Sequence, residues 1–150
     1  MASISVVGEA DLAELLRLMR AYCDFYEVAP ADEDLLAMSQ ALIADSEREG
    51  FQLIARDEGG SAVGFATVFW NWSTSTARRD ALMNDLFVAP EVRGSGLAEA
   101  LIGECSRLVR EHGGRVLEWQ TARDNIRAQA VYDRVGGKRD DRWLSYSLEL

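Results

Sequence analysis

A short segment with two glycines, Arg93-Gly94-Ser95-Gly96, stands where the sequence changes from an apolar strand-like run to a helical pattern. Glycines at such a place allow the backbone to turn so that several N–H groups point the same way. The first turn of a helix adds further N–H groups without intrahelical partners, and a partial positive charge. The chemistry that this combination offers is the binding of an anion, in particular a phosphate or a diphosphate.

The residues around the two glycines exclude the commonest nucleotide-binding motifs. A Walker-type loop requires Gly-Lys-Ser or Gly-Lys-Thr, and the sequence contains neither. A dinucleotide fingerprint requires a third glycine, whereas Gly96 is followed by Leu97-Ala98-Glu99. On the two glycines alone, a tight strand-to-helix turn without a ligand is as good an interpretation as a phosphate site.

Two motifs together resemble the GNAT family of N-acetyltransferases. Arg93-x-x-Gly96-x-Ala98 resembles the family's acyl-CoA diphosphate signature, Arg/Gln-x-x-Gly-x-Gly/Ala, between a strand like "DLFVAPE" and a helix like "LAEALI". Further along, "DNIRAQAVYDRVGG" resembles the second family element, Asn-x-x-Ala-x-x-x-Tyr-x-x-x-Gly. The residues in register with it are Asn125, Ala128, Tyr132 and Gly136. The resemblance covers most of the chain, and two motifs at the right separation are far more specific than one.

The resemblance implies transfer of an acetyl group from acetyl-CoA to an amine. It also implies that Leu86–Val88 runs beside the pantetheine arm, where a bulge would open the sheet into a cleft. A backbone N–H near Phe87 or Val88 would then polarise the thioester carbonyl. The expected cofactor-binding residues are Leu86, Phe87, Val88, Arg93, Gly94, Ser95, Gly96, Leu97, Ala98, Asn125, Ala128 and Tyr132.

Tyr132 is the residue expected to protonate the departing thiolate, because a phenol carries a donatable proton and the resemblance places its helix beside the cofactor. General acid catalysis of this kind contributes about 10²–10⁴-fold. The alternative is that Tyr132 packs in the core with Val131 and Val135. Asn125 is expected to hydrogen-bond the cofactor arm or, alternatively, to cap the helix that follows it.

The attacking amine arrives protonated, so the reaction needs a base or a water chain that leads to one. Relatives that acetylate polyamines often carry a glutamate where this chain has Asn84, so that role does not transfer directly. Asp85 is the favoured base, and Glu118 on the next predicted strand is a second carboxylate. The alternative for Asp85 is structural, with a buried carboxylate holding the loop or the N-terminal helix in place.

The segment "AYCDFYEVAP" stands where the family's first helices shape the acceptor pocket. An aromatic wall with an anionic end would suit a primary amine through cation–π and ionic contacts. Core packing is the preferred interpretation for Tyr22 and Phe25, because aromatic stripes with helical spacing are more often buried. The residues expected to bind the substrate are Tyr26, Glu27, Trp70 and Asn84.

Periodicity predicts the elements that position these residues. Helical patterns cover residues 9–25, 32–44, 97–112 and 125–135, and strand patterns cover residues 3–7, 51–57, 61–72, 80–88, 115–121 and 142–150. The order begins antiparallel and contains one β-α-β unit, which should cross over right-handed. We therefore expect a single N-acetyltransferase domain over residues 1–150. Its fold would be α/β (α+β), with a GNAT-like mixed, mostly antiparallel sheet, a central V-shaped splay and helices on both faces.

Composition argues against several classes of binding partner. A net charge of -9 and arginines scattered among acids argue against nucleic acid. There is no apolar run of membrane-spanning length and no signal-peptide pattern at the start, so no membrane is expected and the location is predicted to be cytoplasmic. Cys23 and Cys105 lack metal-ligand spacing and His112 is the only histidine, so no metal is expected. A homodimer is compatible with the apolar final strand.

The acceptor is expected to be the primary amine of a small molecule, acetylated by direct attack. Within the family, "DLFVAPEVRG" and the late aromatic residues Trp143 and Tyr146 are most similar to the diamine and polyamine type. Two alternatives remain. One is a protein or peptide N-acetyltransferase, against which the bulky "FWNW" segment argues. The other is a non-catalytic acyl-CoA-binding module that senses or regulates.

Overall fold

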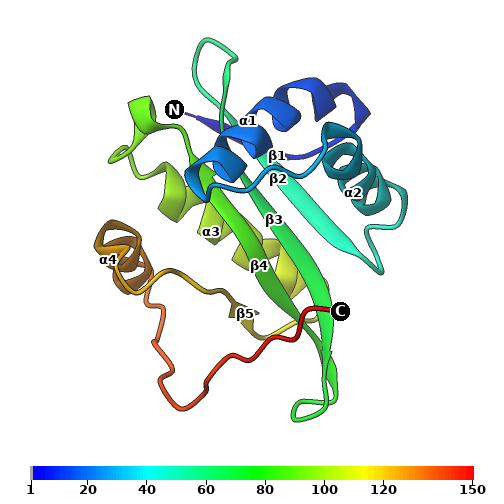
Figure 1. Cartoon of the computed structure of the whole chain (residues 1–150), viewed down its shortest axis with the longest axis vertical. Helices are drawn as coiled ribbons and strands as arrows, with labels where there is room; N and C mark the ends of the chain where they lie inside the picture. Colours follow the sequence, from blue (N-terminus) through cyan, green and yellow to red (C-terminus); the bar gives the residue numbers. More distant parts are fainter. Residues whose placement is uncertain (1) are drawn as a thin grey trace. The chain divides into compact units, whose positions relative to one another are not determined.

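The structure is a computed structural model that describes residues 2–150. These residues form two compact units, one that ends at Gln120 and one from Thr121 to Leu150. The first unit carries the sheet and three α-helices, and the second carries one α-helix, α4 (Ile126–Arg134; Figure 1). A single N-acetyltransferase domain over residues 1–150 stays a prediction.

Five strands form one sheet in the order β1-β2-β3-β4-β5. They are β1 (Ser3–Val6), β2 (Gly50–Arg56), β3 (Ala62–Ser73), β4 (Arg78–Val88) and β5 (Leu117–Glu118). The first four strands pair antiparallel, and β4 pairs with β5 in parallel. The prediction of a mixed, mostly antiparallel sheet is confirmed.

Helices cover both faces of this sheet (Figure 1). Helices α1 (Leu12–Phe25) and α2 (Asp32–Ala44) lie on one face, and α3 (Leu97–Glu111) lies on the other. Side chains alternate along a strand, which explains the division. Phe65 and Phe87 enter the core with Leu15 of α1, whereas the neighbouring Gly64 lies against Leu101 of α3.

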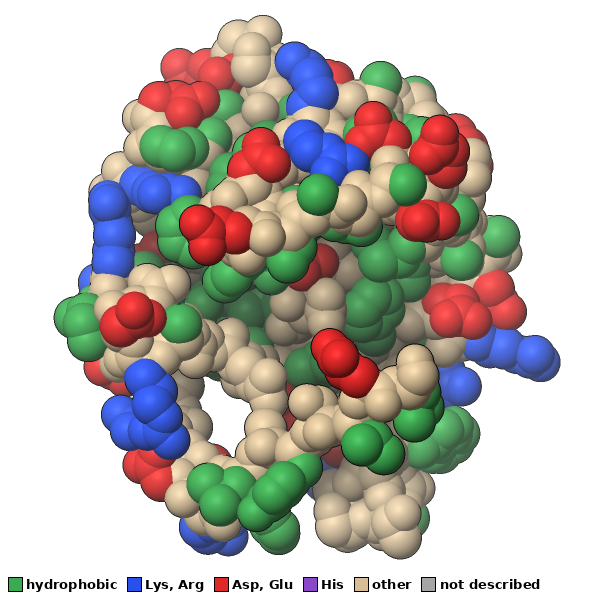
Figure 2. Space-filling view, in the orientation of Figure 1, with side chains coloured by type: hydrophobic (Ala, Val, Ile, Leu, Met, Phe, Trp, Pro, Cys, Tyr) green, Lys and Arg blue, Asp and Glu red, His purple; other side chains and the backbone are tan. Residues whose placement is uncertain are grey.

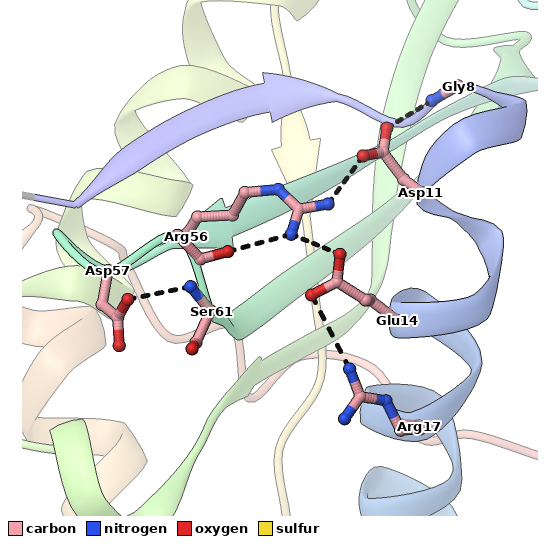
Figure 3. A network of polar contacts seen from close by, with 8 residues as sticks. Gly8, Asp11, Glu14, Arg17, Arg56, Asp57 and Ser61 are labelled. Atoms are coloured by element: carbon pink, nitrogen blue, oxygen red, sulfur yellow. Dashed lines mark hydrogen bonds and ion pairs between the residues drawn. The ribbon is translucent and has the colours of Figure 1, made fainter.

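An ion-pair network fixes the start of α1 against β2 (Figure 3). The Arg56 guanidinium donates to Asp11 Oδ1 at 2.8 Å and to Glu14 Oε1 at 2.6 Å. The backbone N–H of Gly8 donates to Asp11 Oδ2 at 2.9 Å, and this bond is the main reason why the pKa of Asp11 is lowered. The network therefore sets the position of a helix whose far end carries the aromatic residues of the predicted acceptor pocket.

Strands β4 and β5 pair only at one end. The pairs are Ala81 with Leu117 and Leu82 with Glu118, so within residues 2–150 the rest of β4 has no strand partner on that side. This is the predicted splay. The predicted strand over 115–121 is shortened to two residues, and Glu118 is exposed on it.

The predicted strand over residues 142–150 does not form. The structure assigns no strand to residues 119–150. The apolar side chains of the segment are exposed: Trp143, Leu144, Tyr146, Leu148 and Leu150. The prediction was wrong because an alternating pattern shows only that a segment can form a strand, whereas the ladder also requires a partner strand.

Asp80 links the start of β4 to the chain before β5. Its carboxylate accepts the backbone N–H groups of Arg115 and Val116, at 3.1 and 3.2 Å, and the Thr76 hydroxyl at 3.1 Å. Burial by itself would raise the pKa of Asp80, but these hydrogen bonds outweigh it and the pKa is lowered. The folded-state pKa lies below the unfolded value of about 3.9, so the stabilisation is present above that pH and is lost as the pH falls through the folded-state pKa.

We expect the urea midpoint of the parent protein to fall more steeply below about pH 4 than that of Asp80→Asn, which has no carboxylate to titrate there. Asp124→Asn removes a carboxylate at an exposed position and serves as the control. Urea titrations at a series of pH values measure both slopes. An equal pH dependence in the parent and in Asp80→Asn would contradict the assignment.

Candidate functional site

The loop with two glycines joins β4 to α3 through the short turn η2 (Pro90–Val92). Gly94 and Gly96 have φ values of 81° and 85°, in the left-handed region that favours glycine. A Cβ atom built on either residue would meet nothing within 4 Å, so the space beside both is open. Gly96 is also the N-cap of α3, and no side chain caps that helix end. The loop therefore meets the requirements of an anion cradle.

Arg93 ties this loop to the end of the preceding strand. Its Nε donates to the carbonyl oxygen of Val88 at 3.1 Å. Val88 is the last residue of β4, so the guanidinium holds the start of the loop at a defined place beside the splayed strand. The sequence motif indicates an arginine at this position but not this side-chain contact.

The register of β3 and β4 determines which backbone groups of β4 point toward the splay. Ala89 N donates to Val63 O at 2.8 Å, which identifies this pair as one that exchanges hydrogen bonds. By alternation along the ladder, Phe87 also directs its N–H toward β3. Leu86 and Val88 direct theirs to the other side, where no strand within residues 2–150 pairs with this end of β4. Of the two predicted carbonyl-polarising donors, only the N–H of Val88 points to the splay.

A β-bulge turns Asp85 toward α1. Thr67 pairs with Asp85 and Val68 pairs with Met83, so Asn84 is the extra residue of β4. If the regular pairing of Val68 with Met83 continued along β4, Asn84 would lie opposite Thr67 and the Asp85 carboxylate would point to the α3 side of the sheet. The bulge thus lies earlier in β4 than the predicted position beside Leu86–Val88. Asp85 is buried and accepts a hydrogen bond from Asn84 Nδ2 at 3.1 Å.

Tyr22 of α1 is the aromatic neighbour of Asp85. The pKa of Tyr22 is raised, first by burial and then by the charge of Asp85 and a hydrogen bond with it. The phenol is therefore neutral and donates to the carboxylate. The Tyr22 and Tyr26 ring centroids lie 4.9 Å apart, and those of Phe25 and Tyr26 lie 5.1 Å apart. We call these three rings and Asp85 the aromatic–carboxylate cluster.

The structure decides the predicted packing of Tyr22 and Phe25, whereas the predicted substrate contacts of Tyr26, Glu27, Trp70 and Asn84 stay predictions. Tyr22 packs against the core and against Phe65, as expected. The expected burial of Phe25 is wrong, because its side chain is 59% exposed. Tyr26 is 44% exposed, and Glu27 follows it with a left-handed φ of 56° on the surface. These exposed rings can reach a ligand, which a core position would not allow.

Trp70 lies apart from the aromatic–carboxylate cluster. Its ring stacks on His112 with centroids 3.9 Å apart, and its Nε1 donates to Ser46 O at 2.8 Å. Trp70 and Thr67 are three residues apart on β3, so they face opposite sides of the sheet. Trp70 faces α3 and links the end of that helix to the α2–β2 connection. The structure therefore does not bring Trp70 together with the other predicted acceptor residues.

The second sequence motif forms α4 (Ile126–Arg134) in the second unit. Asn125 is its N-cap, and Asn125 Oδ1 accepts the backbone N–H of Ala128 at 3.2 Å. The capping alternative for Asn125 is thus observed. Tyr132 is half-buried on α4, and Gly136 follows with a left-handed φ of 83° that ends the helix. Roles of Ala128 and Tyr132 toward a cofactor stay predictions.

No group of three or more His, Cys, Asp or Glu side chains among residues 2–150 is placed to hold a metal ion. Cys23 and Cys105 are buried and free, and burial raises the pKa of Cys105 to about 12. None of the helices over this range is both long and apolar enough to cross a bilayer.

Known proteins share this sequence pattern and fold. A family model described as the acetyltransferase (GNAT) family matches residues 15–137. The chain is similar to the uncharacterized N-acetyltransferase YhfO of Bacillus subtilis (strain 168), with 27% identity over 141 residues that cover 94% of this chain and 93% of that protein. It is also similar to thialysine N-epsilon-acetyltransferase of Mus musculus, with 23% identity and coverages of 94% and 88%. The crystal structure of a probable acetyltransferase matches with a TM-score of 0.85 at 25% identity, covering 99% of this chain and 97% of the other.

Proposed function

The chain belongs to the acetyltransferase (GNAT) family and is an N-acetyltransferase, and from this premise we propose that it transfers an acetyl group from acetyl-CoA to the primary amine of a small molecule by direct attack. The aromatic–carboxylate cluster is the observation that carries the choice of acceptor. Exposed aromatic rings beside a buried carboxylate attract an ammonium group through cation–π and ionic contacts. The similarity to a thialysine N-epsilon-acetyltransferase supports an amine at the end of a flexible chain.

Surface charge favours the same class of acceptor. Asp and Glu side chains are spread among arginines over the face that carries α1 and α2 (Figure 2), and the net charge of the whole chain is -9. Such a surface raises the local concentration of cationic molecules. A primary amine is a cation at neutral pH, so it would approach this face readily.

The residues of the loop fit the diphosphate of acetyl-CoA. The fit rests on the left-handed backbone at Gly94 and Gly96, the open space beside both, and a helix start without a side-chain cap. Backbone N–H groups of Ser95, Leu97 and Ala98 would complete the contact with the diphosphate. The backbone of β4 on the side of the splay would run along the pantetheine arm. When bound, acetyl-CoA supplies an activated thioester carbonyl.

Three groups of the chain would then serve the reaction. The Asp85 carboxylate accepts a proton from the incoming ammonium group, which leaves a neutral amine that can attack. The N–H of Val88 donates toward the place where negative charge develops, and one such donor is worth about 2.7–4 kcal/mol. The Tyr132 phenol holds the proton that the thiolate requires.

We propose the cytoplasm as the location. Both cysteines are buried and free, which is typical of a compartment in which thiols stay reduced.

A thiol-release assay with acetyl-CoA tests the proposal. The acceptor panel holds lysine analogues, polyamines, aminoglycosides, amino acids and peptide N-termini, and the N-acetylated form of each active amine is the matched control. We expect turnover with a small primary amine and none with its acetylated form. Turnover with peptides alone, or calorimetric binding of acetyl-CoA without any turnover, would overturn the proposal in favour of a peptide acetyltransferase or a non-catalytic binding module.

A further inference from the structure

A row of polar side chains crosses three strands beneath α1. Gln52 of β2, Thr67 of β3 and Asp85 of β4 are direct cross-strand neighbours on the face that α1 covers. They are 2%, 0% and 9% exposed. Buried polar groups destabilise a core unless they are hydrogen-bonded, so apolar residues would be the simpler choice here. We call these three residues the polar row.

Helices α1 and α2 cover the polar row. Gln52 Nε2 donates to Thr67 Oγ1 at 3.0 Å and lies 3.6 Å from the sulfur of Met19, which the Ser39 hydroxyl also approaches at 3.8 Å. Gln52 Oε1 has no hydrogen-bond partner among the described residues. An unpaired buried oxygen of this kind destabilises a fold. Retaining that destabilisation is understandable if the polar row serves the reaction.

The hydrogen bond between Gln52 and Thr67 leaves the Thr67 hydroxyl proton free to be donated to Asp85. The Thr67 oxygen accepts the amide proton of Gln52, so the Thr67 hydroxyl proton must be directed elsewhere. Asp85 lies directly opposite, and Cβ atoms of such cross-strand pairs are about 4.5–5.5 Å apart, within reach for a hydroxyl and a carboxylate.

We propose that Gln52 and Thr67 are positioning residues for Asp85. Gln52 orients the Thr67 hydroxyl, and that hydroxyl donates to the Asp85 carboxylate and holds it toward the incoming ammonium group. This inference rests on the proposed function, because the polar row acts only through Asp85.

Other groups approach Asp85 from different elements. Tyr22 and Cys23 face it from α1, and Asn84 contacts it from β4. Burial first, and then the charge of Asp85, raise the pKa of Tyr22; burial likewise raises the pKa of Cys23, against the influence of Arg20. Both α1 groups are therefore neutral at physiological pH. Thr67 is the donor on the side of the sheet, and it stabilises the ionised carboxylate that the reaction needs.

Thr67→Val tests the inference, because it replaces the hydroxyl with a methyl group of similar size. With the best amine of the panel, we expect kcat to fall roughly tenfold, since one hydrogen bond to a charged group is lost. The KM for acetyl-CoA should not change. The acid limb of the pH–rate profile should move to higher pH, because the ionised carboxylate has lost a donor. Thr67→Ser keeps the hydroxyl and should restore both kcat and the profile.

Gln52→Leu is a second variant that leaves the Thr67 hydroxyl in place but removes the group that orients it. We expect a smaller fall in kcat and no loss in the urea midpoint, because the unpaired oxygen is removed as well. Parental kcat and pH profile in Thr67→Val, together with an impaired Asp85→Asn, would overturn the role of the polar row and leave the proposed function intact.

An isotope-edited infrared spectrum of the Asp85 carboxylate supplies a readout that does not need turnover. Its antisymmetric stretching band should shift between the parent and Thr67→Val and return in Thr67→Ser. Identical spectra would contradict the proposed hydrogen bond from Thr67 to Asp85, whatever the activity of the variants. A parent protein without turnover on any amine would instead overturn the proposed function and with it the catalytic role of the polar row.

Discussion

Gly96→Val is expected to raise the dissociation constant of acetyl-CoA by about 10²-fold. A side chain at this position would occupy the open space beside the loop and keep the diphosphate from the backbone N–H groups. Hydrogen bonds to charged groups contribute about 1.5–3 kcal/mol each, and every 1.4 kcal/mol is tenfold in affinity, so the loss of one or two has this size. Calorimetric titration with acetyl-CoA measures the change.

Gly60→Val is the matched control for this change. Gly60 lies in the turn between β2 and β3 with a φ of 86°, and a Cβ there would also meet nothing within 4 Å. The backbone strain of valine at a left-handed position, roughly 1–3 kcal/mol, is therefore the same in both variants. Gly60→Val should lose stability and keep its affinity for acetyl-CoA. Equal affinities in the two variants would contradict the diphosphate cradle.

Asp85→Asn is expected to lower kcat with a small amine by about 10²–10⁴-fold, the usual contribution of a positioned base. Asparagine has nearly the same shape and can still accept the hydrogen bond from Tyr22, but it cannot take a proton from the ammonium group. The loss should be smaller at alkaline pH, where more of the amine is already neutral. Initial rates over a pH series measure both effects.

Asp80→Asn provides the contrast on the same strand. Asp80 is also a buried carboxylate, but its hydrogen bonds go to the backbone before β5. We expect Asp80→Asn to lose stability and keep kcat well below its unfolding temperature, and Asp85→Asn to show the reverse. If Glu118→Gln lost kcat and Asp85→Asn did not, the base would be Glu118 on β5 and not Asp85.

Local conformational requirements made the loop predictable from the sequence. Gly94 and Gly96 indicate a tight turn of the backbone before a helix, and both have left-handed φ values in the structure. The bounds of α2 were also predictable, because Asp32 follows a proline-containing segment and the apolar pattern ends near Ala44. In each case the information lies within a few neighbouring residues.

Properties that depend on strand pairing were not predictable in the same way. The direction of Asp85 depends on one extra residue in β4, which only the register with β3 reveals. Trp70 was assigned to the acceptor end because the local pattern does not show which face of β3 each helix covers. The prediction of a strand over 142–150 was wrong for a related reason, since an alternating pattern does not show whether a partner strand is available. One feature of the sequence could have indicated the polar row, namely the glutamine within the apolar run "FQLIARD".

An NMR titration of ¹⁵N-labelled protein with coenzyme A is the most direct test of the diphosphate cradle. The glycine amide signals of Gly94 and Gly96 should shift strongly on addition of coenzyme A, whereas pantetheine, which lacks the diphosphate, should leave them in place. The amide signal of Gly60 should not respond to either compound. Unchanged Gly94 and Gly96 signals at saturating coenzyme A, or equal shifts with pantetheine, would show that the diphosphate binds elsewhere.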